Sequence, residues 1–200
     1  MLAPEADLRP PPDTDARIVL HGVRWEDYVR LAETRGDASV PRMTYLGGIL
    51  ELMSPGKRHE QDKTKLGRLV EAYADLLGIV LEGLGSWTVK RDQEQAGAEA
   101  DECYVVGGGA DEPEAPDLAI EVVHTSGGLS KLEVWRRLGA REVWFWLGNR
   151  LRVYVRGDDD WRASEQSALL PVFDLGLIER CMAEPTQFAA VRALRAALAS

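Results

Sequence analysis

The sequence predicts an α/β (α+β) domain in which a central mixed β-sheet is flanked by helices. The order of elements carries this prediction: a helix, strands, a long helix, strands, a short helix, strands and a last helix follow one another. The 200 residues suit one domain, and a hydrophobic content of 45% is typical of a folded core. We therefore expect a disordered tail over residues 1–17 and one domain over residues 18–200.

The first half of the chain is expected to form a helix, a hairpin and a long helix. Residues 22–36 place apolar side chains at helical spacing. Residues 42–56 favour two short strands around a Gly-Gly turn. A long helix is expected over residues 58–77, ended by Gly78. Its predicted apolar face consists of Leu66, Leu69, Val70, Tyr73, Leu76 and Leu77.

The second half alternates strands with two helices. The tryptophans of this half, Trp135, Trp144 and Trp146, are expected in the core. The last segment, residues 185–200, is amphipathic, with Phe188, Val191, Leu194 and Leu198 expected to face inward. Before it, we expect strands at 79–92, 100–107, 117–123, 141–148 and 150–160, and a helix over 129–138.

Composition argues against several classes of protein. The N-terminal segment lacks the basic start and apolar stretch of a signal peptide. No apolar run approaches the ~20 residues that span a bilayer. Cys103 and Cys181 are too few and too far apart for a disulfide framework or a zinc site. We expect a cytoplasmic protein without a membrane partner, and the net charge of −9 argues against general coating of DNA.

A carboxylate stands in the middle of a mostly apolar strand. Side chains alternate along a strand, so Glu121 shares a face with Asp117, Ala119 and Val123. Burial of an unpaired carboxylate costs several kcal/mol. Glu121 therefore needs a partner, a place at the end of the strand, or a bound cation.

Lys131 is the natural partner of this carboxylate. It begins the apolar stripe of the following helix, with Val134, Trp135 and Leu138 at positions i+3, i+4 and i+7. A helix N-terminus disfavours a cation, so a lysine there is unexpected without a counter-charge. From this segment alone, a buried structural ion pair and a functional site are equally good interpretations.

Asp101 adds a second carboxylate to this pair. It opens another short apolar strand, so two carboxylates and a lysine are expected to converge on one edge of the sheet. Such oxygen ligands hold Mg²⁺, which bridges to phosphate oxygens and activates water. A nearby lysine orients the nucleophile or stabilises charge on phosphorus.

These residues resemble the PD-(D/E)XK nuclease superfamily. The segments "EADECYVV" and "PDLAIEVVHTSGGLSKLEVWRRLGAREVWFW", with "GGILELMSPGKRHE" before the long helix, are similar to its Uma-type restriction-endonuclease family. The resemblance covers roughly residues 20–195. It implies a restriction-endonuclease-like core, in which a mixed sheet is flanked by helices.

The resemblance assigns roles to three residues. Asp101 matches the first metal-binding Asp, although Ala100 stands where proline is common. Glu121 matches the acid of the (D/E)XK element. The third position of that element is Val123, and Lys131 occupies the place from which the family supplies its lysine.

The acid that the superfamily carries on its first helix is best matched by Glu60. His59 stands beside it as a candidate ligand, general base or helix-start residue. Glu51 and Asp62 are nearby competitors for the same role.

Our first functional hypothesis is an endonuclease that hydrolyses DNA phosphodiester bonds. Asp101 and Glu121 would bind Mg²⁺ (or Mn²⁺), Lys131 would assist, and Glu60 or His59 would tune the site. The resemblance also suggests a homodimer, for which "VWFW" and the C-terminal helix could supply apolar surface. The alternatives are a catalytically silent nuclease fold that serves binding or assembly, and a purely structural Glu121–Lys131 pair.

Overall fold

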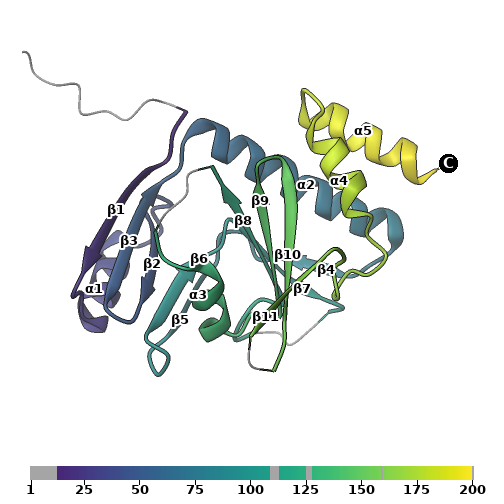
Figure 1. Cartoon of the computed structure of the whole chain (residues 1–200). Helices are drawn as coiled ribbons and strands as arrows, with labels where there is room; N and C mark the ends of the chain where they lie inside the picture. Colours follow the sequence, from purple (N-terminus) through teal and green to yellow (C-terminus); the bar gives the residue numbers. More distant parts are fainter. Residues whose placement is uncertain (1–12, 109–112, 125–127, 159, 200) are drawn as a thin grey trace, which may run out of the picture.

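The chain folds into two β-sheets and five helices over the part that the computed structural model describes, residues 13–108, 113–124, 128–158 and 160–199. Figure 1 shows the sheets side by side, with the long helix α2 (Lys57–Leu77) running across one end of both. The mixed α/β class is confirmed. The predicted mixed sheet flanked by helices is the six-stranded one, and a five-stranded sheet, which was not predicted, stands beside it.

The five-stranded sheet is antiparallel throughout. Its hairpin, predicted from the Gly-Gly pair, pairs Leu46 with Ile49 across positive-φ glycines. Helix α1 (Trp25–Arg35) packs on it through Tyr28. Its strands, in spatial order, are β1 (Ala16–His21), β3 (Ile49–Ser54), β2 (Arg42–Leu46), β6 (Ala96–Glu99) and β5 (Thr88–Arg91).

The six-stranded sheet is mixed. Its one parallel pair joins β8 to β9, and helix α3 (Lys131–Leu138) makes the crossover between them. The turn between β9 and β10 uses Gly148 and Asn149, both with positive φ. In spatial order the strands are β11 (Trp161–Ser164), β10 (Arg150–Arg156), β9 (Glu142–Leu147), β8 (Leu118–Val123), β7 (Glu102–Val106) and β4 (Leu81–Gly83).

Strand β6, which the sequence pattern did not indicate, lies between β2 and β5 in the five-stranded sheet. Three of its residues, Ala96, Gly97 and Ala98, are small and carry little strand propensity. They are small because the ring of Tyr28 lies against them, so that a Cβ built on Gly97 would collide with the Tyr28 hydroxyl oxygen. The signal for this strand therefore lies in a contact across about seventy positions of the chain, not in its own segment.

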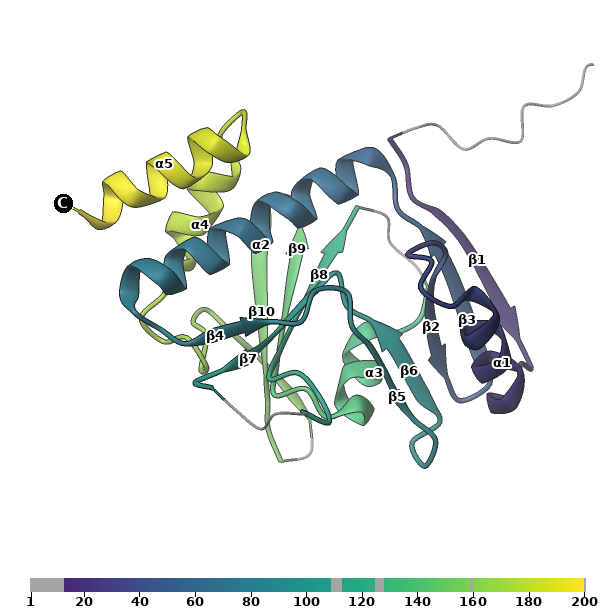
Figure 2. The ribbon, with the colours of Figure 1, turned by 180° about the vertical axis from the view of Figure 1, so that it is seen from behind.

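Two apolar layers hold the six-stranded sheet. One face packs against α2, α4 (Leu175–Met182) and α5 (Gln187–Leu198). Figure 2 shows α4 and α5 on the same side of the sheet as α2. The other face packs against α3 through Trp135. The three predicted core tryptophans are buried, at 0%, 0% and 3% exposure for Trp135, Trp144 and Trp146.

Two expectations about the ends of the chain need correction. Strand β1 begins at Ala16, two residues before the predicted start of the domain, and residues 1–12 of the expected tail lie outside the described residues. Phe188 is 66% exposed and does not face inward. Helix α5 instead packs through Ala190, Val191 and Leu194. Among the described residues, no helix has the length and apolarity to cross a bilayer.

The contact between Tyr28 and Gly97 generates a stability prediction. Gly97→Ala should lower the free energy of unfolding by about 1–3 kcal/mol, because the added Cβ forces the buried ring to shift. Urea melts of the variant and of Gly97→Ala combined with Tyr28→Leu measure this. The effect of the alanine should shrink in the Tyr28→Leu background. Equal effects in both backgrounds would show that the close contact does not set the cost.

Candidate active site

Asp101 and Glu121 meet where strands β7 and β8 pair. The antiparallel register places Glu102 opposite Ile120, so one further step places Asp101 opposite Glu121. The two strands are neighbours, as predicted. Asp101 itself directly precedes Glu102, the first residue of β7. The backbone N–H of Val122 donates to Asp101 Oδ2 at 2.6 Å. The Glu121–Val122 peptide thus connects the two carboxylates.

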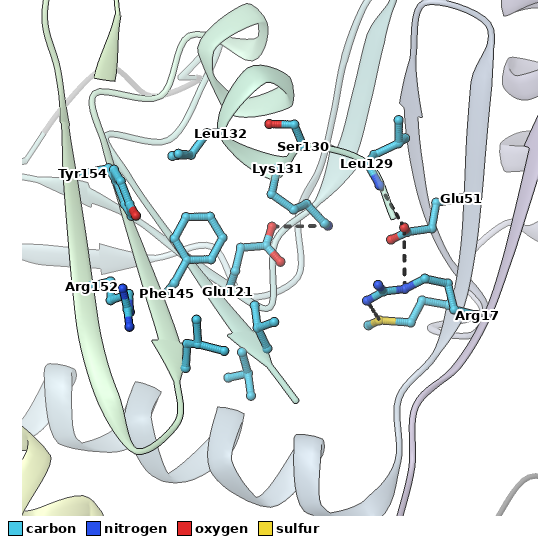
Figure 3. Close-up of a pocket in the computed structure, with 14 residues that line it drawn as sticks. Arg17, Glu51, Glu121, Leu129, Ser130, Lys131, Leu132, Phe145, Arg152 and Tyr154 are labelled. Carbon is cyan, nitrogen blue, oxygen red and sulfur yellow. Dashed lines mark hydrogen bonds and ion pairs between the residues drawn. The ribbon is translucent and has the colours of Figure 1, made fainter. Parts of the chain in front are cut away.

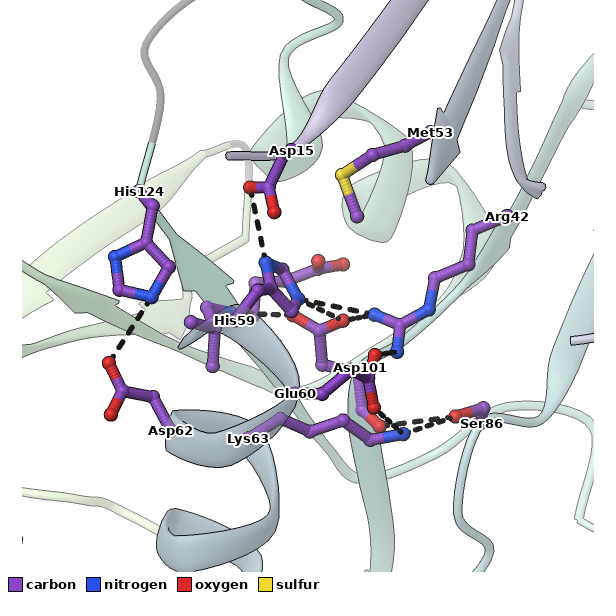
Figure 4. A network of polar contacts seen from close by, with 12 residues as sticks. Asp15, Arg42, Met53, His59, Glu60, Asp62, Lys63, Ser86, Asp101 and His124 are labelled. Carbon is purple, nitrogen blue, oxygen red and sulfur yellow. Dashed lines mark hydrogen bonds and ion pairs between the residues drawn. The ribbon is translucent and has the colours of Figure 1, made fainter. Parts of the chain in front are cut away.

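Arg42 is the counter-ion of Asp101. Its guanidinium forms ion pairs with Asp101 Oδ1 and, at 2.6 Å, with Glu60 Oε1 (Figure 4). The Arg42 side chain comes from β2 of the other sheet and is only 7% exposed. The structure therefore brings Asp101 and Glu60 together, as predicted, but through a cation of the chain itself that the sequence pattern did not indicate.

His59 lies in the first turn of α2, between two carboxylates. Its Nε2 is 3.0 Å from Asp101 Oδ1 and 3.3 Å from an Arg42 nitrogen, while Nδ1 is 3.3 Å from Asp15 Oδ2. Burial lowers the pKa of His59 below its ordinary value of 6.5, with Asp15 opposing and Arg42 reinforcing the shift. A neutral ring carries one N–H, so it can donate either from Nδ1 to Asp15 or from Nε2 to Asp101, but not to both.

Asp15 anchors this histidine to the start of the fold. Its Oδ1 accepts from the Gly56 N–H at 2.9 Å, just before α2 begins. The expectation of a disordered tail is wrong at this residue, because the surrounding prolines and acids suggest a tail while Asp15 itself is bound to the fold. A short polar residue directly before an apolar run was the only local signal for its role.

Glu121 is held from helix α3. Its Oε1 accepts from the Trp135 indole N–H at 2.7 Å and lies 3.3 Å from Lys131 Nζ. The predicted pairing of Glu121 with Lys131 is confirmed. Lys131 Nζ also donates to Thr44 Oγ1 at 3.0 Å, so the lysine links β8 to β2 of the other sheet.

The Glu121–Lys131 pair opens onto a cavity between the two sheets. The cavity has a volume of about 310 Å³, and both side chains contribute to its wall (Figure 3). The Lys131 side chain is 19% exposed, so the pair is not sealed in a dry core. The residues that line this cavity do not include Asp101, so the two predicted metal ligands do not both face it. Asp101 turns toward Arg42 and His59 instead.

The two competitors of Glu60 have other partners. Asp62 Oδ2 is 3.2 Å from His124 Nε2, on the other side of the helix start in Figure 4. Glu51 lies 3.5 Å from an Arg17 nitrogen and accepts from the Leu129 N–H at 3.2 Å. Of the three acids, Glu60 is the one that shares a cation with Asp101.

One half-buried acid lies beside this network. Glu102 follows Asp101 and turns toward α2, where a Cβ on Gly67 would stand 3.2 Å from its Cγ. Burial raises the pKa of the Glu102 carboxyl, with nearby Lys63 opposing the shift. The glycine lets the helix approach the strand that carries the site.

The donor types suit a hard divalent cation, but the chain's own cations hold them. Asp101, Glu121 and Glu60 offer the carboxylate oxygens that Mg²⁺ prefers. Among the residues that the structure describes, no three His, Cys, Asp or Glu side chains are grouped to bind a metal ion. Arg42 and Lys131 provide the positive charge beside Asp101 and Glu121. A metal at these carboxylates would therefore compete first with Arg42.

Comparisons with known proteins agree with this fold. Residues 25–179 match the model of the Uma2 family, described as "Putative restriction endonuclease". The structure resembles the crystal structure of "a putative nuclease belonging to DUF820" from Anabaena variabilis ATCC 29413, with a TM-score of 0.52 and 14% identity. The match covers 86% of this chain and 99% of that one and shows the shared fold. No curated protein sequence matches the chain.

The neutral state of His59 generates a pH prediction. Its pKa is lower in the folded chain than the ordinary 6.5, so the unfolded chain takes up this proton at higher pH. Stability should therefore decline as the pH falls below about 6.5. Urea melts between pH 7.5 and the folded pKa measure the slope, and His59→Gln should flatten it. The same slope in both proteins would contradict the assignment.

Proposed function

Since the chain belongs to the Uma2 family of putative restriction endonucleases, we propose that it hydrolyses DNA phosphodiester bonds in a reaction that depends on Mg²⁺ or Mn²⁺. The proposal assigns Asp101 and Glu121 as metal ligands and Lys131 as the catalytic cation. It assigns Glu60 and His59 as positioning residues that act through Arg42 and Asp101.

One observation carries the proposal. A glutamate in the middle of a core strand and a lysine in the first turn of a helix form a pair that opens onto a cavity. The opening leaves the Lys131 side chain 19% exposed at the cavity wall, where its ammonium group can contact a ligand, which a sealed pair could not do. The opening favours a role in binding or reaction over the purely structural alternative.

The chain's own residues can do two things for a phosphodiester in this cavity. Lys131 Nζ, fixed between Glu121 and Thr44, presents positive charge to a phosphate oxygen and can stabilise charge that develops there. Trp135 orients Glu121 by donating to its Oε1. A divalent cation at Asp101 and Glu121 would supply a Lewis acid for the phosphate and lower the pKa of water.

A catalytically silent nuclease fold is the second candidate. The net charge of −9 and the pairing of Arg42 with Asp101 favour it. In that case the same carboxylates would serve only to join the two sheets, and added Mg²⁺ would change nothing.

A homodimer is part of the proposal. The "VWFW" segment cannot supply the interface through its tryptophans, which are buried in the fold. Strand β1 lies at the edge of the five-stranded sheet and exposes Ile18 and Leu20 at 60% and 41%. Edge strands of this kind pair readily with another chain. Light scattering that finds only monomers at micromolar concentration would count against the dimer.

Lys131→Met separates catalysis from folding. We expect the variant to lose Mg²⁺-dependent plasmid nicking, while its free energy of unfolding changes by less than about 1 kcal/mol, because the Lys131 side chain is partly exposed and Trp135 still donates to Glu121. Lys90→Met, which removes an exposed lysine of β5, is the matched control and should keep the activity. A loss of more than about 3 kcal/mol, with no nicking by the wild type, would favour the buried structural pair.

Arg42→Gln tests the competition between arginine and metal. Without Mg²⁺ the variant should be destabilised by roughly 3–5 kcal/mol, because the buried Asp101 loses its counter-ion. Adding Mg²⁺ should raise the melting temperature of the variant more than that of the wild type, because ligand binding to the folded state stabilises it. Equal shifts in both proteins would show that Arg42 and the metal do not share these carboxylates.

A further inference from the structure

A row of three side chains crosses the six-stranded sheet beside the Glu121–Lys131 pair. The register places Glu121 on β8 opposite Phe145 on β9, and Phe145 opposite Arg152 on β10. Residues directly opposite in a sheet point to the same face, and neighbouring strands lie about 4.8 Å apart. All three side chains line the cavity, as Figure 3 shows. The row thus offers an acid, an aromatic ring and a cation at regular spacing.

The walls of the cavity combine apolar surface with positive charge. Phe145 and Leu132 supply apolar surface, and the Tyr154 ring packs edge-on against Phe145 with centroids 5.7 Å apart. The Arg152 side chain is exposed at the rim, and among the described residues it has no carboxylate partner. A chain with a net charge of −9 has few such sites for an anion.

These features suit one unstacked nucleotide. Aromatic rings in single-strand binding sites stack on bases of any sequence, and cations beside them hold the phosphates. A volume of about 310 Å³ lies at the small end of ligand pockets and is too small for a duplex. A base that is paired and stacked within a duplex could not reach the Phe145 ring, which lies between Glu121 and Arg152 in this row.

We propose that the cavity is a nucleotide-binding subsite in which Phe145 stacks on an unpaired base and Arg152 binds the phosphate beyond it. The inference rests on the proposed function, because the second phosphate of the same nucleotide is then placed at Lys131, the proposed catalytic cation. The substrate at this site is then single-stranded DNA or a duplex nucleotide turned out of the stack.

The test compares binding of two probes without requiring cleavage. The probes are a labelled thymidine tetranucleotide and the same chain with one central abasic position, measured by fluorescence anisotropy in EDTA. The wild type should bind the abasic probe roughly five- to hundredfold more weakly, as expected for one lost base–aromatic stack. Equal binding of both probes, or no binding of either, would overturn the subsite.

Three variants locate the base. Phe145→Leu should bind both probes equally, and Phe145→Trp should restore the preference for the intact base; preference retained in the leucine variant would overturn the role of Phe145. Arg152→Gln should weaken both probes alike, whereas a loss confined to the intact probe would overturn its role as a phosphate contact. Phe188→Leu, at an exposed aromatic on α5, is the matched control and should change neither affinity.

Failure of the subsite and failure of the nuclease proposal give different results. A protein that prefers the intact probe but does not nick plasmid with Mg²⁺ keeps the subsite and loses the nuclease. A protein that nicks plasmid but binds both probes equally keeps the nuclease and loses the subsite. Near-ultraviolet circular dichroism of the Phe145 variants shows that any loss of binding comes from a folded protein.

Discussion

The buried charge of Asp101 is the constraint on which the rest of the site depends. Asp101 is 1% exposed directly before β7 begins, and a buried charge is stable only when paired and hydrogen-bonded. Arg42 from the other sheet, His59 from α2 and the Val122 N–H meet this requirement together. Two sheets and the start of the long helix are thereby fixed around one carboxylate.

The same constraint explains why the site has two parts. On one side Arg42 holds Asp101 and Glu60, and on the other Lys131 links Glu121 to Thr44 and faces the cavity. Arg42 and Thr44 lie two residues apart on β2, so one face of that strand supplies partners to both parts. A metal ion at Asp101 would replace charge that Arg42 now provides, so its binding would require this arginine to move.

Local pattern revealed the elements and the acids, whereas the partners came from distant parts of the chain. Alternation in β8 and the apolar stripe of α3 were enough to predict that Glu121 and Lys131 meet. Nothing near Arg42 indicates that a residue in a hairpin would reach Asp101, because this contact depends on how two sheets are placed. Strand β6 and the role of Asp15 were missed for the same reason. Strand β6 contacts Tyr28 and Asp15 contacts His59, and in both cases the partner lies far away along the chain.

Calorimetric titration with Mg²⁺, repeated with Mn²⁺, tests the central claim most directly, because it asks whether Asp101 and Glu121 bind a metal at all. We expect saturable binding by the wild type, and loss of that binding in the isosteric variants Asp101→Asn and Glu121→Gln while both remain folded. No binding by the wild type, or unchanged binding in both variants, would contradict it.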